Sequence, residues 1–581
     1  MHKRIAVAAA LLFGCASQPN NDLEPVDLTI HQKAQVTLTT PAPGSFIAAT
    51  GDGMVEVAGN AHGSSIQING RVTPVDATGN FHARIPAVEG VNVIDAHLSG
   101  LLGGESQRAF LYGRFAKPTA TVASGVMVRS TAAAFDDRSG DLDDFSAVAR
   151  ALLAQVDVMQ YVRQLPPFNW TLGPASVDVA VTGVRFAQDQ TALTLSPRDG
   201  GAHSRGGLRA LEIALQLTFS LDGIFKTSTG ATVSVDTVGF DADLDAQYQA
   251  GAIVAVTETP QIRLGTLAIK TDLNFDTIDK LLSYLANQFK DLIASTVAQQ
   301  IQASAANHFA LALNQIGLPS SFSLQPYGLA ATLVATNAFD GAAFDAQGVT
   351  VSAGTNFAWP AGTVAPAGGS LVLGSTPALA FPAATMSISI ALDALNQATF
   401  AVWGQNGLSR EVYPGKKYFG FKLDPLLATP ALPPVIAAGS GNLRVSLGDI
   451  VVTTTLHTWL ADFPVRATIS GASDLGLDVD PQNGALRMTP TGTPAIWVDV
   501  NTLFGVVPDA LLAPLSQLLQ QLAPGIVQKM VKPIEVPLPH LKLEKLIPGS
   551  TAALGLSAPV SVAVDAKALR VMVSGDLAQY R

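Results

Sequence analysis

The segment Ala202-His203-Ser204-Arg205-Gly206 places a serine beside a histidine, two residue types that together can form a nucleophile and its base. A nucleophilic serine in such a segment needs small flanking residues and a sharp turn from a strand into a helix. Here the first small position is alanine, and no strand-then-helix pattern surrounds it. We therefore interpret residues 199–207 as a solvated hairpin loop, and we expect a protein that is not an enzyme.

Histidines and carboxylates could instead serve as metal ligands. The nine histidines never stand at His-x₃-His or a similar spacing, which disfavours zinc. An acidic cluster at the start of a predicted helix lies where the helix dipole favours negative charge; its members are Asp136, Asp137, Asp141, Asp143 and Asp144. The cluster only loosely suggests a calcium loop, so we predict no metal site and leave calcium binding by residues 136–144 open. The sequence has no glycine pattern typical of a phosphate or dinucleotide loop, so no cofactor is expected.

The chain begins with the features of a secretory signal. Basic residues at positions 3 and 4 precede an apolar run over 5–13, and Gly14 precedes Cys15. The run is far shorter than the ~20 residues that span a bilayer, so it is not expected to be a membrane helix. Cys15 is the only cysteine in 581 residues, which leaves it without a disulfide partner.

Leu12-Phe13-Gly14-Cys15 resembles the lipobox of bacterial lipoproteins, with Phe13 unusual at its place. The resemblance implies that residues 1–14 are removed, that Cys15 carries diacylglycerol and a further acyl group such as palmitate, and that residues 15–35 form a tether. No aspartate follows Cys15, which favours the outer membrane, on its periplasmic face or at the cell surface. The alternative is a plain signal peptide with an incidental cysteine.

Composition limits the class of protein. Hydrophobic residues make up 48% of the chain and charged residues only 14%, against about 25% in typical chains. The apolar surplus must therefore be buried inside the fold. The net charge of −10, with no basic run beyond Lys416-Lys417, disfavours nucleic acid or an anionic membrane surface as partner. The length predicts three or four domains of roughly 100–200 residues.

Residues 36–117 show short runs of alternating apolar residues. Asn69-Gly70 and the segment 76–79 separate these runs at hairpin spacing. The pattern resembles bacterial immunoglobulin-like domains, which implies a small all-β sandwich. We expect it to be a spacer, with carbohydrate or protein binding as the alternative.

The remaining residues combine long strands with long amphipathic helices. The clearest strand, over 211–221, has apolar residues at strict period two. Helical stripes are predicted from Asp141 to the prolines at 166–167, over about 28 residues from Asp276, near 388–400 and over 508–530. Long helices on curved sheets that are dry on one face can form a tapering apolar core.

This order of elements resembles the bactericidal/permeability-increasing protein family, which has the tubular lipid-binding (TULIP) fold. Supporting segments are 240–246 with 261–265 before the long helix, 377–386 before a short helix, and 534–539 after the last helix. The resemblance implies an α+β fold with two elongated barrels of twisted antiparallel strands, at 118–325 and 326–581, each wrapped round long helices. It also implies a central sheet between the barrels, with the immunoglobulin-like sandwich in front.

The family resemblance implies that acyl chains of phospholipid or another lipid lie between the long helices and the curved sheets. The residues expected to contact lipid are Leu152, Val156, Leu281, Leu285, Phe289, Leu292, Leu515, Leu518 and Leu522. The chain departs from the family because one cysteine cannot form its disulfide, and because the basic cluster of some members is missing.

The expected function is lipid binding or transfer in the cell envelope. The alternative is a non-catalytic surface adhesin or structural interaction protein whose barrels are filled with side chains. A lipid hydrolase is a more distant third possibility.

Overall fold

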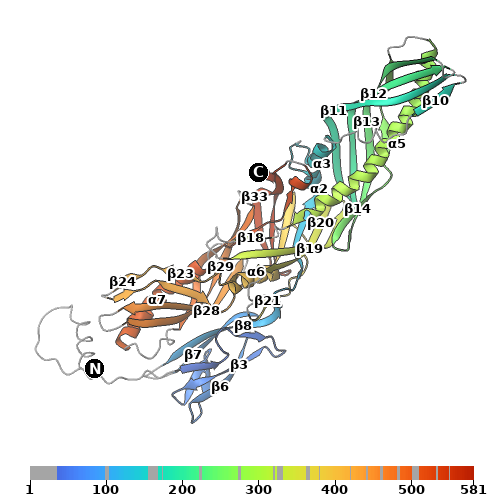
Figure 1. Ribbon diagram of the computed structural model, residues 1–581. Helices are drawn as coiled ribbons and strands as arrows, with labels where there is room; N and C mark the ends of the chain where they lie inside the picture. Colours follow the sequence, from blue (N-terminus) through green and yellow to red (C-terminus); the bar gives the residue numbers. More distant parts are fainter. Residues whose placement is uncertain are drawn as a thin grey trace, which may run out of the picture.

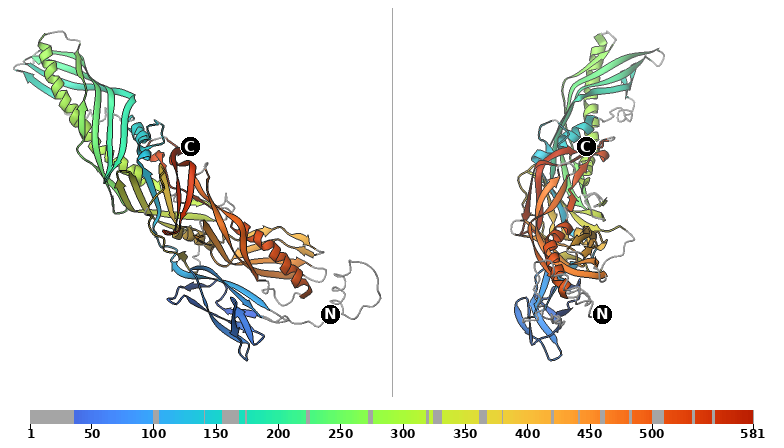
Figure 2. Two further views of the ribbon diagram at one scale, coloured as in Figure 1. Left: turned by 180° about the vertical axis from the view of Figure 1, so that it is seen from behind. Right: turned by 90° about the vertical axis from the view of Figure 1, so that its left-hand side faces the viewer.

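The structure is a computed structural model. It describes residues 36–98, 104–139, 141–154, 168–172, 175–221, 225–271, 276–317, 321–323, 331–360, 367–378, 380–418, 421–439, 442–457, 462–480, 484–499, 509–531, 534–547 and 550–580. The expected lipidation residue Cys15 lies outside these ranges. The molecule is elongated, with the N-terminal domain at one end and strands β10 (Phe168–Leu172), β11 (Ala175–Arg198) and β12 (Gly201–Leu221) at the other (Figures 1 and 2).

Two small sheets form the N-terminal domain. One consists of β1 (Val36–Thr40), β3 (Met54–Ala61) and β6 (Asn80–Pro86). The other has the order β2-β8-β7-β4-β5, with β2 (Phe46–Ala48), β8 (Glu105–Ala116), β7 (Gly90–His97), β4 (Ser65–Ile68) and β5 (Arg71–Pro74). Their inward apolar residues, among them Val57, Phe81 and Phe110, are at most 1% exposed and form a separate core.

A nine-stranded sheet, here called the central sheet, lies in the middle of the molecule (Figure 1). Its order is β17-β32-β33-β34-β22-β9-β20-β19-β18. Its strands are β9 (Val122–Thr131), β17 (Ile316–Gly317), β18 (Ser321–Ser323), β19 (Thr332–Asp345), β20 (Gly348–Ala358), β22 (Met386–Ala391), β32 (His540–Lys542), β33 (Ala553–Asp565) and β34 (Arg570–Tyr580). Short helices α2 (Ala132–Phe135) and η2 (Leu543–Lys545) adjoin it, and α6 (Leu392–Gly404) packs against it.

The distal sheet is curled and contains the longest strands. It comprises β10 (Phe168–Leu172), β11 (Ala175–Arg198), β12 (Gly201–Leu221), β13 (Phe225–Gln249), β14 (Ala252–Thr257), β15 (Gln261–Leu264) and β16 (Leu267–Thr271). Helix α3 (Phe145–Ala154) packs on β11, and α5 (Asp276–Asn314) runs beside β13–β16 (Figure 1).

The proximal sheet lies beside the N-terminal domain. It comprises β23 (Arg410–Tyr413), β24 (Lys416–Tyr418), β25 (Phe421–Leu423), β26 (Leu426–Pro430), β27 (Val435–Ala438), β28 (Leu443–His457), β29 (Asp462–Asp480), β30 (Ala485–Asp499) and β31 (Ile534–Pro537). Helix α7 (Asp509–Met530) packs on β29 and β30. Strand β21 (Ser370–Val372) pairs with β8.

The described residues are mostly β, arranged in curled sheets with few helices, which confirms the coarse prediction of long twisted strands beside helices. None of the described helices combines the length and hydropathy needed to cross a membrane. The predicted helix at 276 is longer than expected, at 39 residues. Of the first predicted helix, residues 155–167 lie outside the description.

Two expectations of local structure are wrong. Residues 201–207 are not a loop, because β12 begins at Gly201 and only the turn at 199–200 separates it from β11. Ile388 does not belong to a helix, because it lies in β22, and α6 begins only at Leu392. In both places the segment is a strand because it pairs with other strands in the fold. The spacing of apolar residues over such a short segment does not distinguish the alternatives.

Candidate functional site

One face of the distal sheet is lined by apolar side chains in register across strands. Leu215 of β12 lies opposite Val181 of β11 and Ala231 of β13. Two residues along β12, Ile213 continues this face. Period-two alternation puts these residues on one side because successive side chains of a strand point to opposite faces.

Helix α5 contributes to the same cluster. Phe289 and Ile293, four residues apart on one helical stripe, are 3% and 5% exposed and pack with the sheet residues. Leu292 and Val297 pack against the cluster as half-buried residues. We call the cluster formed by α5 and this side of the sheet the distal apolar face.

Much of the distal apolar face is only half-buried. Its half-buried members are Val181, Val184, Phe186, Leu208, Phe219, Ile262, Leu264, Leu267, Ile269, Leu292 and Val297. Removing apolar surface from water contributes roughly 25 cal/mol per Å². These inward side chains therefore still expose apolar surface, which an apolar ligand can bury. Contiguous apolar surface of this kind marks ligand grooves or interaction sites.

The corresponding face under α7 is packed differently. Leu519, Ala523, Ile526 and Val527 of α7 are each 0% exposed. On the facing strands Leu447, Ile450, Val452, Ile469 and Leu475 are at most 1% exposed. Other members of this helix–sheet pair are half-buried: Leu477, Ile496, Val498, Leu518 and Leu522. The distal apolar face, where half-buried side chains of β11, β12, β15, β16 and α5 lie in one cluster, is the candidate site.

The structure places the predicted lipid-contact residues unevenly. Phe289 and Leu292 lie on the distal apolar face. Leu152 of α3, and Leu518 and Leu522 of α7, are half-buried against the main core. The lipid contacts of all these residues stay predictions. Val156 lies outside the described residues, and the side chains of Leu281, Leu285 and Leu515 lie outside the description although their backbones belong to α5 and α7.

Sequence reasoning missed the sheet side of the site. Phe186, Leu208, Leu264 and Ile269 were not among the predicted contact residues, although the period-two spacing of 262–264 and 267–269 is visible in the sequence. That spacing shows that one face is dry. It cannot show how far a helix distant in sequence covers that face.

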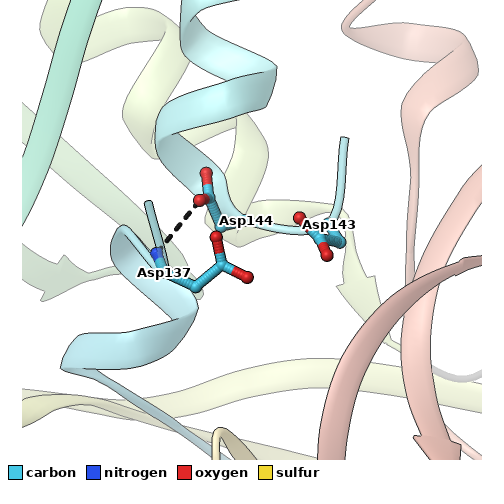
Figure 3. Close-up of side chains that lie close together, drawn as sticks. All are labelled: Asp137, Asp143 and Asp144. Atoms are coloured by element: carbon cyan, nitrogen blue, oxygen red, sulfur yellow. Dashed lines mark hydrogen bonds between the residues drawn. The ribbon is translucent and has the colours of Figure 1, made fainter. Parts of the chain in front are cut away.

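The acidic cluster forms a helix cap. Carboxylate atoms of Asp137, Asp143 and Asp144 lie within 4.8 Å of one another (Figure 3). Asp144, 1% exposed, accepts hydrogen bonds from the N–H groups of Ala147 at 2.5 Å and Asp137 at 3.1 Å. Burial raises the pKa of Asp144 to about 6. These bonds satisfy a free amide at the start of α3, so capping is the role that the geometry supports.

His203 and Ser204 do not form a catalytic pair. Both lie within β12, so their side chains point to opposite faces of the sheet. Ser204 is 3% exposed, whereas His203 Nδ1 lies 2.7 Å from Asp243 Oδ1 on the neighbouring strand. A cross-strand polar pair is the simplest description of this histidine.

No protein-family model and no curated protein matches the chain. Among solved structures it is similar to lipopolysaccharide binding protein, with TM-score 0.41 and 14% identity over 79% of this chain and 100% of that chain. P47 of Clostridium botulinum E1 gives TM-score 0.24 and 7% identity over 79% of this chain and 100% of that one. P47 from Clostridium botulinum A2 gives TM-score 0.25 and 7% identity over 79% of this chain and 99% of that one. At these TM-scores the likeness assigns no family, so the site is interpreted from its own side chains.

Proposed function

We propose that the protein binds the acyl chains of a lipid along the distal apolar face, between α5 and the curled sheet. The half-buried apolar side chains on both α5 and the strands support this function, because an apolar ligand between them would complete their burial. An enclosed acyl chain gains about 0.8 kcal/mol per buried CH₂ group, and the host face gains burial as well.

The length of the face suits this ligand. Leu208 and Phe219 are both half-buried members on β12, eleven positions apart. At about 3.3 Å per residue this stretch covers about 36 Å. One leaflet contributes about half of the ~30 Å hydrocarbon core of a bilayer, so an acyl chain fits well within that length.

Enlarging a half-buried residue tests the proposal. We expect Val184→Trp to lower the amount of phospholipid per chain while costing the delipidated protein little stability, because the new side chain occupies space that lipid otherwise fills. The matched control is Val452→Trp, at a residue 1% exposed in the proximal sheet. Overpacking there should cost about 1–3 kcal/mol and leave lipid content unchanged.

The measurements are native mass spectrometry of residues 16–581 prepared without detergent, phosphorus analysis of extracted lipid, and calorimetry. If Val184→Trp lowered stability as much as Val452→Trp did and left lipid content unchanged, the distal face would be ordinary core. A surface adhesin or structural interaction protein would then be the better description.

We further propose that the protein is a lipoprotein of the bacterial outer membrane, anchored through acylated Cys15. The signal-like start and the lipobox-like segment before the single cysteine support this location. In the finer description of the fold, the distal sheet with α5 and the proximal sheet with α7 correspond to two TULIP-like barrels. The N-terminal domain then corresponds to an immunoglobulin-like sandwich.

A further inference from the structure

The N-terminal domain meets the proximal sheet along one edge of β8. Two carboxylates from the proximal sheet accept hydrogen bonds from backbone amides of this edge. Ala109 N–H donates to Asp449 Oδ1 at 2.7 Å, and Gln107 N–H donates to Asp499 Oδ2 at 2.8 Å. These amides are two residues apart. The same spacing separates successive N–H groups that point out from one edge of a strand and would bond to a neighbouring strand. The carboxylates therefore take the place of a strand.

Asp449 is held in position by an irregularity of β28. The register of β28 with β29 shifts between Leu447 and Ile450, and Asp449 adopts a φ of 46° within this bulge. Its own N–H donates to Ser470 Oγ at 3.1 Å, and its carbonyl accepts a bond from Ala431 N–H at 3.0 Å. A bulge of this kind redirects a side chain out of the regular alternation.

Both carboxylates are buried, with Asp449 3% and Asp499 4% exposed. Arg108 lies between the bonded amides in sequence and attracts both carboxylates. Its guanidinium donates to the carbonyls of Leu38 at 2.6 Å and Pro41 at 3.0 Å within the N-terminal domain. Burying two carboxylates costs free energy that only good hydrogen bonds and a nearby cation offset, so such groups mark a specific junction.

The rest of the same edge is also paired. Leu111 N–H donates to the Ser45 carbonyl at 2.9 Å, and β2 pairs with β8 over 111–113. Strand β21, from the main body, pairs with 114–116. An unpaired strand edge is normally solvated or protected by charge, whereas here β2 together with β21 and two carboxylates of the main body occupies it.

Apolar packing seals the junction. Ala109, Leu111 and Leu432 are each 0% exposed in a cluster that joins β8 to the segment before β27. Gly448 makes the close approach possible, because a Cβ there would lie 2.7 Å from Leu432 Cδ1 and 3.0 Å from Ala109 Cβ.

We propose that Asp449 and Asp499 clamp the N-terminal domain onto the proximal sheet, so that the domain is a rigid part of the body and not a flexible spacer. The domain lies at the end opposite the tip of the distal sheet (Figures 1 and 2). A lipid anchor preceding residue 36 would then be attached at the end of the molecule opposite the tip of the distal sheet. This orientation rests on the proposed anchoring, whereas the clamp itself does not.

Distance measurements between spin labels test the clamp without lipid. A Cys15→Ser background has no other cysteine, so Val72→Cys in the N-terminal domain and Leu427→Cys in the proximal sheet, 70% and 47% exposed, can be labelled alone. We expect one narrow distance distribution. A broad distribution without further substitution would overturn the proposal.

Substitution of both carboxylates tests their role. Asp449→Ala with Asp499→Ala should broaden the distribution, whereas Asp474→Ala, an exposed aspartate on β29, should leave it unchanged. A folded double variant with the original narrow distribution would overturn the clamp. If the double variant fails to fold, hydrogen exchange of the unsubstituted chain decides: protected Gln107 and Ala109 amides support the clamp, and exchange as fast as in solvated loops overturns it.

Discussion

At the scale of single residues, the buried carboxylates stand out in a chain with few charges. Asp144 caps a helix, and Asp449 joins two parts of the molecule. Burial raises the pKa of both side chains to about 6, although hydrogen bonds from backbone amides partly offset this rise. Ionisation of either side chain therefore lowers the stability of the folded protein. The hydrogen bonds of each side chain nevertheless fix the position of the segment that donates them.

The pKa of Asp449 predicts how stability changes with pH. A group whose folded-state pKa lies above its unfolded value stabilises the fold fully below the unfolded pKa and loses this contribution as the pH rises through the folded pKa. A rise from 3.8 to about 6 corresponds to about 3 kcal/mol. We expect the chain to gain stability between pH 7 and pH 4.5 relative to Asp449→Asn.

Asparagine is the suitable replacement because it keeps an oxygen that accepts the Ala109 N–H bond and does not titrate. The measurement is the denaturant midpoint of both proteins over this pH range. Parallel curves would show that Asp449 titrates as it does in the unfolded chain, and that burial does not govern its ionisation.

At the scale of elements, α7 packs closely on the proximal sheet, and an outward-facing glycine of the distal sheet provides a control position. Helix α7 approaches β29 at Gly471, where a Cβ would lie 2.8 Å from Val527 Cγ2 and 3.2 Å from the Ala495 carbonyl. Gly183 of β11 lies opposite exposed Ala214 on the outward face of the distal sheet, where a Cβ would meet only Ala214 Cβ, at 3.6 Å. Close packing tolerates added volume poorly, and loose packing tolerates it well.

We therefore expect Gly471→Ala to destabilise the protein by about 1 kcal/mol or more, because Val527 must move within a filled core. Gly183→Ala should be neutral within about 0.5 kcal/mol. Thermal unfolding of both variants compares the two sites, and lipid content should not change in either. Equal stability of the two variants would argue that the core under α7 can relax around an added methyl group.

At the scale of the whole molecule, the apolar composition is distributed over separate cores. The N-terminal domain has its own core, a large core joins the central and proximal sheets with residues of β11–β14, and the distal apolar face forms a further cluster. Helix α5, with 39 residues, contributes to two of them: Phe289 and Ile293 to the distal apolar face, and Phe309 and Leu313 to the large core. The elongated arrangement places this face and the N-terminal domain toward opposite ends (Figure 2).

The proposed membrane attachment depends on Cys15. Stable anchoring takes more than one acyl chain, and the predicted lipid on Cys15 supplies them. We expect Cys15→Ser to move the protein from the membrane fraction to the soluble fraction and to abolish labelling with a fatty-acid analogue. The melting temperature of the body should be unchanged. Equal labelling of both proteins would refute the lipobox interpretation.

The sequence by itself determined the local patterns. Period-two spacing over 211–221 predicted β12, and the apolar stripe from Asp276 predicted α5, because both patterns depend on neighbours within a few residues. It also placed Phe289 and Leu292 on the side of the helix that meets the sheet.

Only the tertiary structure decided how closely each helix packs on its sheet and how the parts are joined. The apolar stripe of α7 does not reveal its close approach to β29, because that fit depends on residues distant in sequence, such as Gly471 against Val527. The contacts of Asp449 and Asp499 with β8 join positions more than 300 residues apart. A local pattern carries no information on such pairing, since the free energy of a buried carboxylate depends on what the fold places beside it.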